Sequence, residues 1–211
     1  MLELFYQKGD ELPEGDPNRK LKGRVVFLGD RVRDQHGAAA VFEELASSPA
    51  GMEASKFVDA YGLIAGHVCQ QADAEQAYTQ ALLESKYETW MRVPAKDRKP
   101  EWGDAIYVVK LIKALYGHPQ AGAFWEQRCE RALRNAGFVP LGDCGEWRSV
   151  FYHPKDLTLL MVYVDDFKMS GPKAGVEKSW KRIVSQTEWN DDAKVNELAV
   201  KLGPREDVNH F

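Results

Sequence analysis

The sequence predicts an α+β fold in which helices pack on an antiparallel sheet, and three observations support this prediction. Strand-like and helix-like segments alternate irregularly, which argues against a doubly wound parallel sheet. An apolar run over residues 157–164 is followed, after two aspartates, by a second short apolar stretch over residues 167–169, which is typical of a β-hairpin. The segment after Pro119 carries one apolar stripe at helical spacing and predicts a long amphipathic helix.

The first half of the chain predicts short elements separated by turn residues. Glycine and proline recur in residues 1–20, so this leading segment is expected to be irregular. β-Branched residues predict a strand over residues 24–28. Apolar spacing predicts helices over residues 38–46, 54–66 and 74–85, and strands over residues 68–73, 87–93 and 106–111. The charged residues 95–104 are expected to form an exposed loop.

The second half begins with the clearest element of the sequence. After a turn at residues 117–119, a helix is predicted whose apolar stripe consists of Ala121, Phe124, Trp125, Cys129, Ala132, Leu133 and Ala136. We interpret the stripe as core packing, with Gly137 as the C-cap. The remaining predicted elements are strands over residues 149–153, 157–164 and 198–202, and a helix marked by Val176, Trp180, Ile183 and Val184.

Charge is unevenly distributed along the chain. The 28 lysine and arginine residues and 32 aspartate and glutamate residues give a net charge of −4, which taken as a sum argues against nucleic-acid binding. Basic residues gather near the N-terminus at Arg19, Lys20, Lys22, Arg24, Arg31 and Arg33. Acidic residues gather near the C-terminus at Glu188, Asp191, Asp192, Glu197, Glu206 and Asp207. These clusters indicate either a functional polarity or ordinary solvated faces.

Other features exclude whole classes of protein. No run approaches the roughly 18 apolar residues of a membrane span, so no membrane partner is expected. The mixed, acidic start of the chain is unlike a signal peptide. Three scattered cysteines are too few for a disulfide framework or a zinc site. We therefore expect an intracellular protein in a reducing setting.

The adjacent carboxylates of Asp165 and Asp166 lie at the turn of the predicted hairpin. Like charges beside a sheet that excludes water repel each other, and a divalent cation removes that cost. Hard oxygen ligands of this kind suit Mg²⁺, whereas the alternative is an ordinary acidic turn. A two-metal site for phosphoryl or nucleotidyl transfer needs a further carboxylate. Asp73, at the end of the predicted strand 68–73, is the leading candidate.

Four blocks of sequence resemble the motifs of Ty1/copia-type reverse transcriptases and occur in that family's order. Residues 22–26 (Lys-Gly-Arg-Val-Val) resemble the basic fingers motif, and residues 71–78 (Gln-Ala-Asp-Ala-Glu-Gln-Ala-Tyr) resemble the first catalytic motif. Residues 110–117 (Lys-Leu-Ile-Lys-Ala-Leu-Tyr-Gly), followed by Gln120 and Ala123-Phe124-Trp125, are similar to the central block. Tyr163-Val164-Asp165-Asp166 matches the family's signature, and the resemblance covers about residues 17–211.

The resemblance implies the fingers and palm of a right-hand polymerase, with the thumb absent or incomplete. Fingers would comprise residues 1–50 and 84–119, and the palm residues 51–83 and 120–211. The implied reaction is RNA-directed DNA synthesis with two Mg²⁺ ions, for which Mn²⁺ could substitute. The implied partners are an RNA or DNA template with its primer, deoxynucleoside triphosphates, and the thumb, RNase H and integrase regions of a polyprotein. The implied location is a cytoplasmic virus-like particle or the nucleus.

The resemblance also implies roles for single residues at the reacting end of the nucleotide. Asp73 and Asp165 would bind the metal ions, with Asp166 in support, and all three would be catalytic. Lys22 and Arg24 would reach the triphosphate, since a guanidinium suits a bidentate grip. An alternative for Lys22 and Arg24 is that strand-edge charges discourage aggregation.

Further roles are implied around the sugar and the primer. The backbone at Ala74 would run beneath the triphosphate. Tyr78 would stack under the sugar and exclude a 2′-hydroxyl, although a core position on a helix is the alternative. Gln120 would contact the sugar or the template, or would be an ordinary surface residue. Tyr163 and Val164 would border the primer terminus.

Two departures from the family pattern remove positive charge from the presumed template side. Glu75 stands where a lysine is common, and His118-Pro119 with Ala121-Gly122 replaces a basic residue and a Ser-Pro pair. A catalytically inactive, decayed or domesticated nucleic-acid-binding module is the rival hypothesis: the expected lack of a thumb favours it, whereas the intact Asp73, Asp165 and Asp166 favour the enzyme. An unrelated metal-dependent phosphohydrolase would share the carboxylates but would leave the block at residues 110–117 unexplained.

Overall fold

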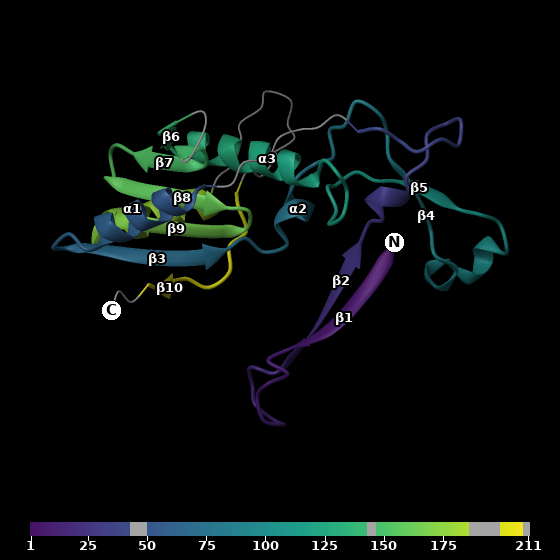
Figure 1. Cartoon of the computed structure of the whole chain (residues 1–211), viewed down its shortest axis with the longest axis horizontal. Coiled ribbons are helices and arrows are strands. Elements are labelled where there is room, and N and C mark those ends of the chain that lie inside the picture. Colours follow the sequence, from purple (N-terminus) through teal and green to yellow (C-terminus); the bar gives the residue numbers. More distant parts are fainter. Residues whose placement is uncertain (43–49, 143–146, 186–198, 209–211) are drawn as a thin grey trace.

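The computed structural model of the chain describes residues 1–42, 50–142, 147–185 and 199–208. Their fold mixes helices and strands, as the sequence predicts, and is built around one six-stranded sheet with two smaller two-stranded sheets (Figure 1). The large sheet has the order β10-β3-β9-β8-β7-β6, and each neighbouring pair in it is antiparallel. Its strands are β3 (His67–Asp73), β6 (Val139–Pro140), β7 (Val150–His153), β8 (Thr158–Tyr163), β9 (Asp166–Pro172) and β10 (Glu206–Asp207).

Helices cover both faces of this sheet. Helices α3 (Ala121–Asn135) and α4 (Lys173–Val184) pack on one face around Trp125, Phe167 and Trp180. Helix α1 (Met52–Gly62) packs on the other face, where Val58 contacts a smaller apolar cluster. Strand β8 shows why both faces are apolar: Leu160 and Val162 join the first cluster, whereas Leu159 and Met161 join the second. A continuous apolar strand therefore lies between two helical layers.

The smaller sheets lie beyond one end of the large sheet. Strands β1 (Leu2–Lys8) and β2 (Lys20–Val26) form a ribbon that projects away from it, and β4 (Trp90–Arg92) pairs with β5 (Val108–Lys110) (Figure 1). Short 3₁₀ turns at Gly29–Arg31, Ala95–Asp97 and Pro100–Trp102 and the short helix α2 (Ala77–Gln80) complete the described elements. The division into fingers and palm remains a prediction.

The end of α3 confirms the predicted cap. Gly137 has φ of 95°, a left-handed conformation that glycine adopts without a Cβ penalty. Its N–H donates to the carbonyl of Arg134, and the N–H of Phe138 donates to the carbonyl of Leu133, both at 3.0 Å. These two bonds form a Schellman motif, which satisfies carbonyls at the helix end.

Four element predictions differ from the structure. The leading segment contains β1, because its glycines and prolines lie mainly in the loop between β1 and β2. The helix predicted over 74–85 is reduced to α2, and residues 38–42 of the helix predicted over 38–46 are not helical, while residues 43–46 lie outside the described part. The strand predicted over 198–202 is, over its described residues 199–202, only an isolated bridge between Ala74 and Leu202.

Tertiary hydrogen bonds explain why the helix at residues 74–85 is short. Beyond α2, Ala81 is extended and its carbonyl accepts from the N–H of Ala114 at 2.9 Å, while the N–H of Leu83 donates to Ile112 at 2.8 Å. Gln76 is left-handed, with φ of 51°, and α2 begins only after it. Within the described part of the chain, no helix has both the length and the apolar character required to cross a lipid bilayer.

Candidate active site

The pairing of β3 with β9 brings the predicted carboxylates to one end of the sheet. Asp73, the last residue of β3, lies opposite Asp166, the first residue of β9. Asp165 occupies the two-residue turn between β8 and β9 together with Val164. Asp73 is therefore a neighbour in space of Asp165 and Asp166, although at least 92 sequence positions separate it from them.

Two hydrogen bonds hold the turn that carries Asp165. The N–H of Ala74, just beyond β3, donates to the carbonyl of Asp165 at 2.7 Å. The indole N–H of Trp125, on α3, donates to the carbonyl of Val164 at 2.6 Å. Val164 has φ of 58°, which is uncommon and costly for a β-branched residue. Trp125 and Ala74 thus hold a strained backbone in place beside the acidic pair.

The acidic residues destabilise each other's charge. Burial, a hydrogen bond with Asp73 and the negative charges of Asp165 and Asp73 together raise the pKa of Asp166 to about 6. None of these effects comes from a cation. Lys168 lies two residues further along β9, but its ammonium group contacts Asp59 of α1 at 3.0 Å and Ser55 at 3.0 Å. The site therefore has an excess of negative charge that a bound cation would relieve.

The donor chemistry of this group suits a hard divalent cation, because carboxylate oxygens are the ligands that Mg²⁺ prefers. The side chains are not arranged as a finished metal site, however. Among the residues that the structure describes, no group of three His, Cys, Asp or Glu side chains is placed so that it could hold a metal ion. Binding of Mg²⁺ therefore remains a proposal.

Two tyrosine rings lie beside Asp165. Tyr78, on α2, packs against Tyr116 with 4.7 Å between the ring centroids. Burial, followed by the charge of Asp165, raises the pKa of Tyr78. The same two effects raise the pKa of Tyr116, and the nearby guanidinium of Arg24 opposes them. Sequence reasoning gave Tyr78 a role but did not single out Tyr116, although it lies in the conspicuous block at residues 110–117.

The basic residues lie on the exposed ribbon. Lys22 and Arg24 are two residues apart in β2 and therefore share a face of the strand. The guanidinium of Arg24 lies 5.8 Å from the centroid of the Tyr116 ring, so Arg24 is connected to the acidic end of the sheet. For Lys22 the structure gives a position, opposite Tyr6 of β1, but no contact with the acidic residues.

Gln120 is not the surface residue that one interpretation allowed. It is buried, immediately before α3, and its side-chain carbonyl accepts a hydrogen bond from the Ser85 hydroxyl. Tyr163 is 49% exposed and lies opposite Asp166 across the β8–β9 hairpin. The proposed contacts of Gln120, Tyr163 and Val164 with nucleotide or primer remain predictions.

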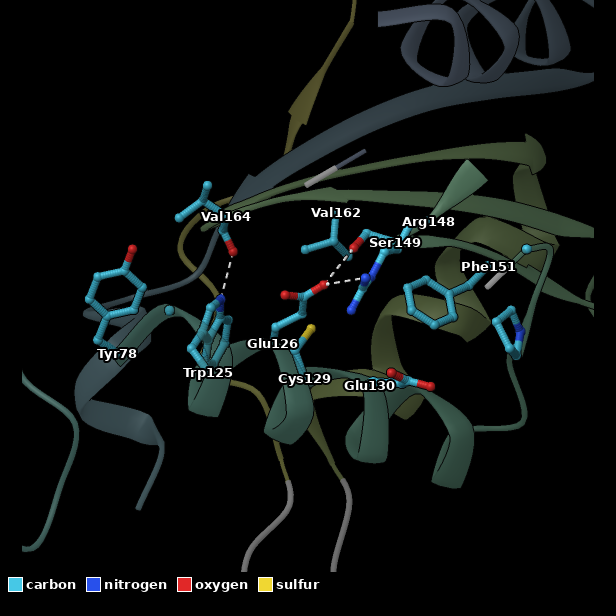
Figure 2. Close-up of a pocket in the computed structure, with 13 residues that line it drawn as sticks. Tyr78, Trp125, Glu126, Cys129, Glu130, Arg148, Ser149, Phe151, Val162 and Val164 are labelled. Atoms are coloured by element: carbon cyan, nitrogen blue, oxygen red, sulfur yellow. Dashed lines mark hydrogen bonds and ion pairs between the residues drawn. The ribbon is translucent and has the colours of Figure 1, made fainter. Parts of the chain in front are cut away.

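A pocket of about 140 Å³ opens beside the turn, between α3 and strands β6, β7 and β8 of the sheet. Figure 2 shows Tyr78 and Trp125 at one end of it, with the Trp125 indole directed at the carbonyl of Val164. Between Trp125 and Phe151, which lies toward the other end, Glu126 accepts a hydrogen bond from Ser149 at 3.4 Å and pairs with Arg148 at 3.6 Å (Figure 2). Sequence reasoning assigned Trp125 only to the core; the need of a buried indole N–H for a partner was the available signal.

Antiparallel strands ending in clustered carboxylates, with aromatic and basic groups alongside, are suited to phosphoryl-transfer chemistry on nucleotides. The sequence comparison is consistent with this class, because a family model described as "Reverse transcriptase (RNA-dependent DNA polymerase)" matches residues 5–199. The chain belongs to this reverse transcriptase family.

The comparisons with solved structures and with curated proteins do not add to this assignment. A telomerase chain from Candida albicans, solved in complex with a fragment of telomeric RNA, resembles this chain with 11% identity and a TM-score of 0.36. The match covers 78% of this chain and 31% of the telomerase chain. No curated protein matches the sequence. The family membership therefore depends on the sequence match rather than on the structural likeness.

Proposed function

We propose that the chain is the fingers-and-palm portion of an RNA-directed DNA polymerase from a Ty1/copia-type retrotransposon. It would add deoxynucleoside monophosphates to a primer on an RNA or DNA template. The observation that carries the proposal is the register of β3 and β9, which sets Asp73 opposite Asp166 and beside the turn residue Asp165. The order of the four motif blocks supports the copia type in particular.

Asp73, Asp165 and Asp166 would hold two Mg²⁺ ions. Bound ions at such a site supply electrostatic stabilisation of the charge that develops during nucleotidyl transfer. The protein itself contributes mainly positioning, because phosphoryl transfer requires little covalent chemistry from side chains. Since no three-ligand group exists among the described side chains, the proposal includes a side-chain rearrangement when metal binds.

The surrounding residues would orient the nucleotide and the primer. Arg24 and Lys22 would bind the triphosphate, the cationic Arg24 from its place over the Tyr116 ring. Tyr78 would lie against the sugar and disfavour a 2′-hydroxyl, which would select deoxynucleotides. The exposed Tyr163 would border the primer terminus. A thumb and the RNase H and integrase regions of a polyprotein would supply the remaining grip on nucleic acid, which depends on phosphate contacts.

A catalytically inactive nucleic-acid-binding module is the second candidate. The absence of a finished three-ligand group among the described side chains is the observation that favours it. The two candidates make different predictions, because an inactive module would bind primer–template without extending the primer.

Primer extension separates these candidates. The full chain would be given oligo(dT) on poly(rA) with dTTP and Mg²⁺, and would be compared with Asp165→Asn. Asp104→Asn, which changes an exposed aspartate in the loop before β5, is the matched control. Loss of a metal ligand, and with it of the electrostatic stabilisation that the bound ions would supply, should slow extension by about 10²–10³-fold in Asp165→Asn and not in the control. Equal inactivity of all three proteins, with binding retained, would support the inactive module.

A further inference from the structure

Tyr116 contacts both Arg24 of the projecting β1–β2 ribbon and Tyr78, which lies beside Asp165 at the acidic end of the large sheet. Its ring lies 4.7 Å from the Tyr78 ring, centroid to centroid, at an interplanar angle of 41°. The guanidinium carbon of Arg24 lies 5.8 Å from the Tyr116 centroid. The same carbon lies 5.8 Å from the centroid of Tyr6, so Arg24 has an aromatic ring from each of two segments within reach. Both distances allow cation–π attraction.

Contacts with the segment that follows β2 fix the backbone position of Tyr116. The N–H of Phe27, the residue just beyond β2, donates to the carbonyl of Tyr116 at 2.7 Å. The next residue, Gly117, has φ of 85°, and a Cβ there would meet the carbonyl oxygen of Phe27 at 2.1 Å. Only glycine permits so close an approach of the two segments. The backbone of Tyr116 therefore cannot move away from the end of β2 without breaking this close approach.

We propose that Tyr116 is a positioning residue for the incoming deoxynucleotide. Its ring contacts both Tyr78 and the Arg24 guanidinium, so that the grip on the triphosphate and the selection of the sugar are set together. This inference rests on the proposed polymerase function, in which Arg24 and Tyr78 contact different parts of the same nucleotide. The two contributions are separable, because Arg24 would act on any triphosphate, whereas Tyr78 would act only where the 2′-hydroxyl differs.

The proposal that Tyr116 sets triphosphate affinity and sugar selection together is tested by measuring the affinities of dATP and ATP for the full chain. The chain is bound to a primer–template whose primer ends in a dideoxynucleotide, so that no extension occurs. Arg24→Ala should weaken both nucleotides equally, and Tyr78→Ala should lower only the preference for dATP. Tyr116→Ala should do both, each by about three- to tenfold. Tyr116→Phe, which keeps the ring, should restore affinity and preference.

Two controls keep the result interpretable. Tyr87→Ala removes a 72% exposed tyrosine that lies near Lys86, and it should change neither quantity. Tyr116→Leu, which keeps apolar bulk without an aromatic face, replaces Tyr116→Ala if the alanine variant does not melt cooperatively.

Each outcome decides the matter. The inference is overturned if Tyr116→Ala changes only one of the two quantities or neither, if Tyr116→Phe fails to restore them, or if the unmodified chain has no preference for dATP. Primer extension with a normal primer reports separately on the polymerase function. An extending chain whose Tyr116 variants are normal would refute the coupling alone, and a non-extending chain with the predicted binding changes would refute the activity alone.

Discussion

The hydrogen bond from Trp125 to the β8–β9 turn should contribute both to the stability of the fold and to the rate of primer extension. Trp125 is 2% exposed, and its indole N–H donates to the carbonyl of Val164 at 2.6 Å. Trp125→Phe keeps an aromatic ring in the core but removes the donor. Loss of a buried hydrogen bond whose acceptor is left behind costs about 1–3 kcal/mol. The smaller ring adds about 1 kcal/mol of lost apolar burial.

The expected destabilisation is therefore about 2–4 kcal/mol, and each kcal/mol corresponds to about 2–4 °C of melting temperature in a chain of this size. Val164 has φ of 58°, a strained conformation that the bond helps to hold, so Trp125→Phe should also displace Asp165 and slow primer extension. Thermal melting measures the first effect, and extension at a temperature where the variant is folded measures the second.

Trp90→Phe is the matched control. Trp90 is 54% exposed, and its indole N–H donates to Glu88 at 3.2 Å. It belongs to the two-stranded β4–β5 sheet and not to the sheet that carries the aspartates of the candidate active site. The same substitution there should change neither melting nor extension. If Trp125→Phe melts within about 1 °C of Trp90→Phe, or extends primers at the normal rate, the hydrogen bond does not hold the turn.

Two other predictions concern the close approach of Gly117 to Phe27 and the protonation of Asp166. Gly117→Ala should destabilise the chain by about 2–5 kcal/mol, because strain at positive φ is joined by overlap with Phe27. Gly15→Ala, with φ of 88° and open space around the new Cβ, isolates the strain alone, and similar denaturation midpoints for the two would contradict the close approach. The pKa of Asp166 is raised from 3.8 to about 6, so the folded chain retains this proton more strongly than the unfolded chain does. Folding stability should therefore fall as pH rises from about 4 to about 6, and Asp166→Asn should reduce that fall in melting experiments; an unchanged pH slope would refute it.

The sequence predicted the middle of the large sheet well because those strands are buried on both faces or form a short hairpin. The apolar run at β8, the two-residue turn and the amphipathic α3 are local signals, and each survives in the fold. The position of Asp73 at a strand end was also a local signal. The pairing of its strand with β9 depends on contacts between segments far apart in the sequence, which a local sequence pattern does not specify.

The errors lie where tertiary contacts override local preference. The apolar spacing at residues 74–85 favours a helix, but Gln76 is left-handed and the backbone of Ala81 and Leu83 pairs with residues 112 and 114. Strand β1 is mostly exposed, so its burial pattern offers no alternation to recognise. Tyr116 was missed as a site residue for a similar reason, since its partners Arg24 and Tyr78 lie more than 35 positions away in the sequence.

Binding of Mn²⁺, counted by the loss of the free-ion electron paramagnetic resonance signal, tests the shared metal site most directly. The unmodified chain should bind Mn²⁺, and Asp73→Asn and Asp165→Asn should each weaken binding by at least about tenfold, while Asp104→Asn should not. Equal Mn²⁺ affinity in all four proteins, or no binding by any of them, would contradict the account.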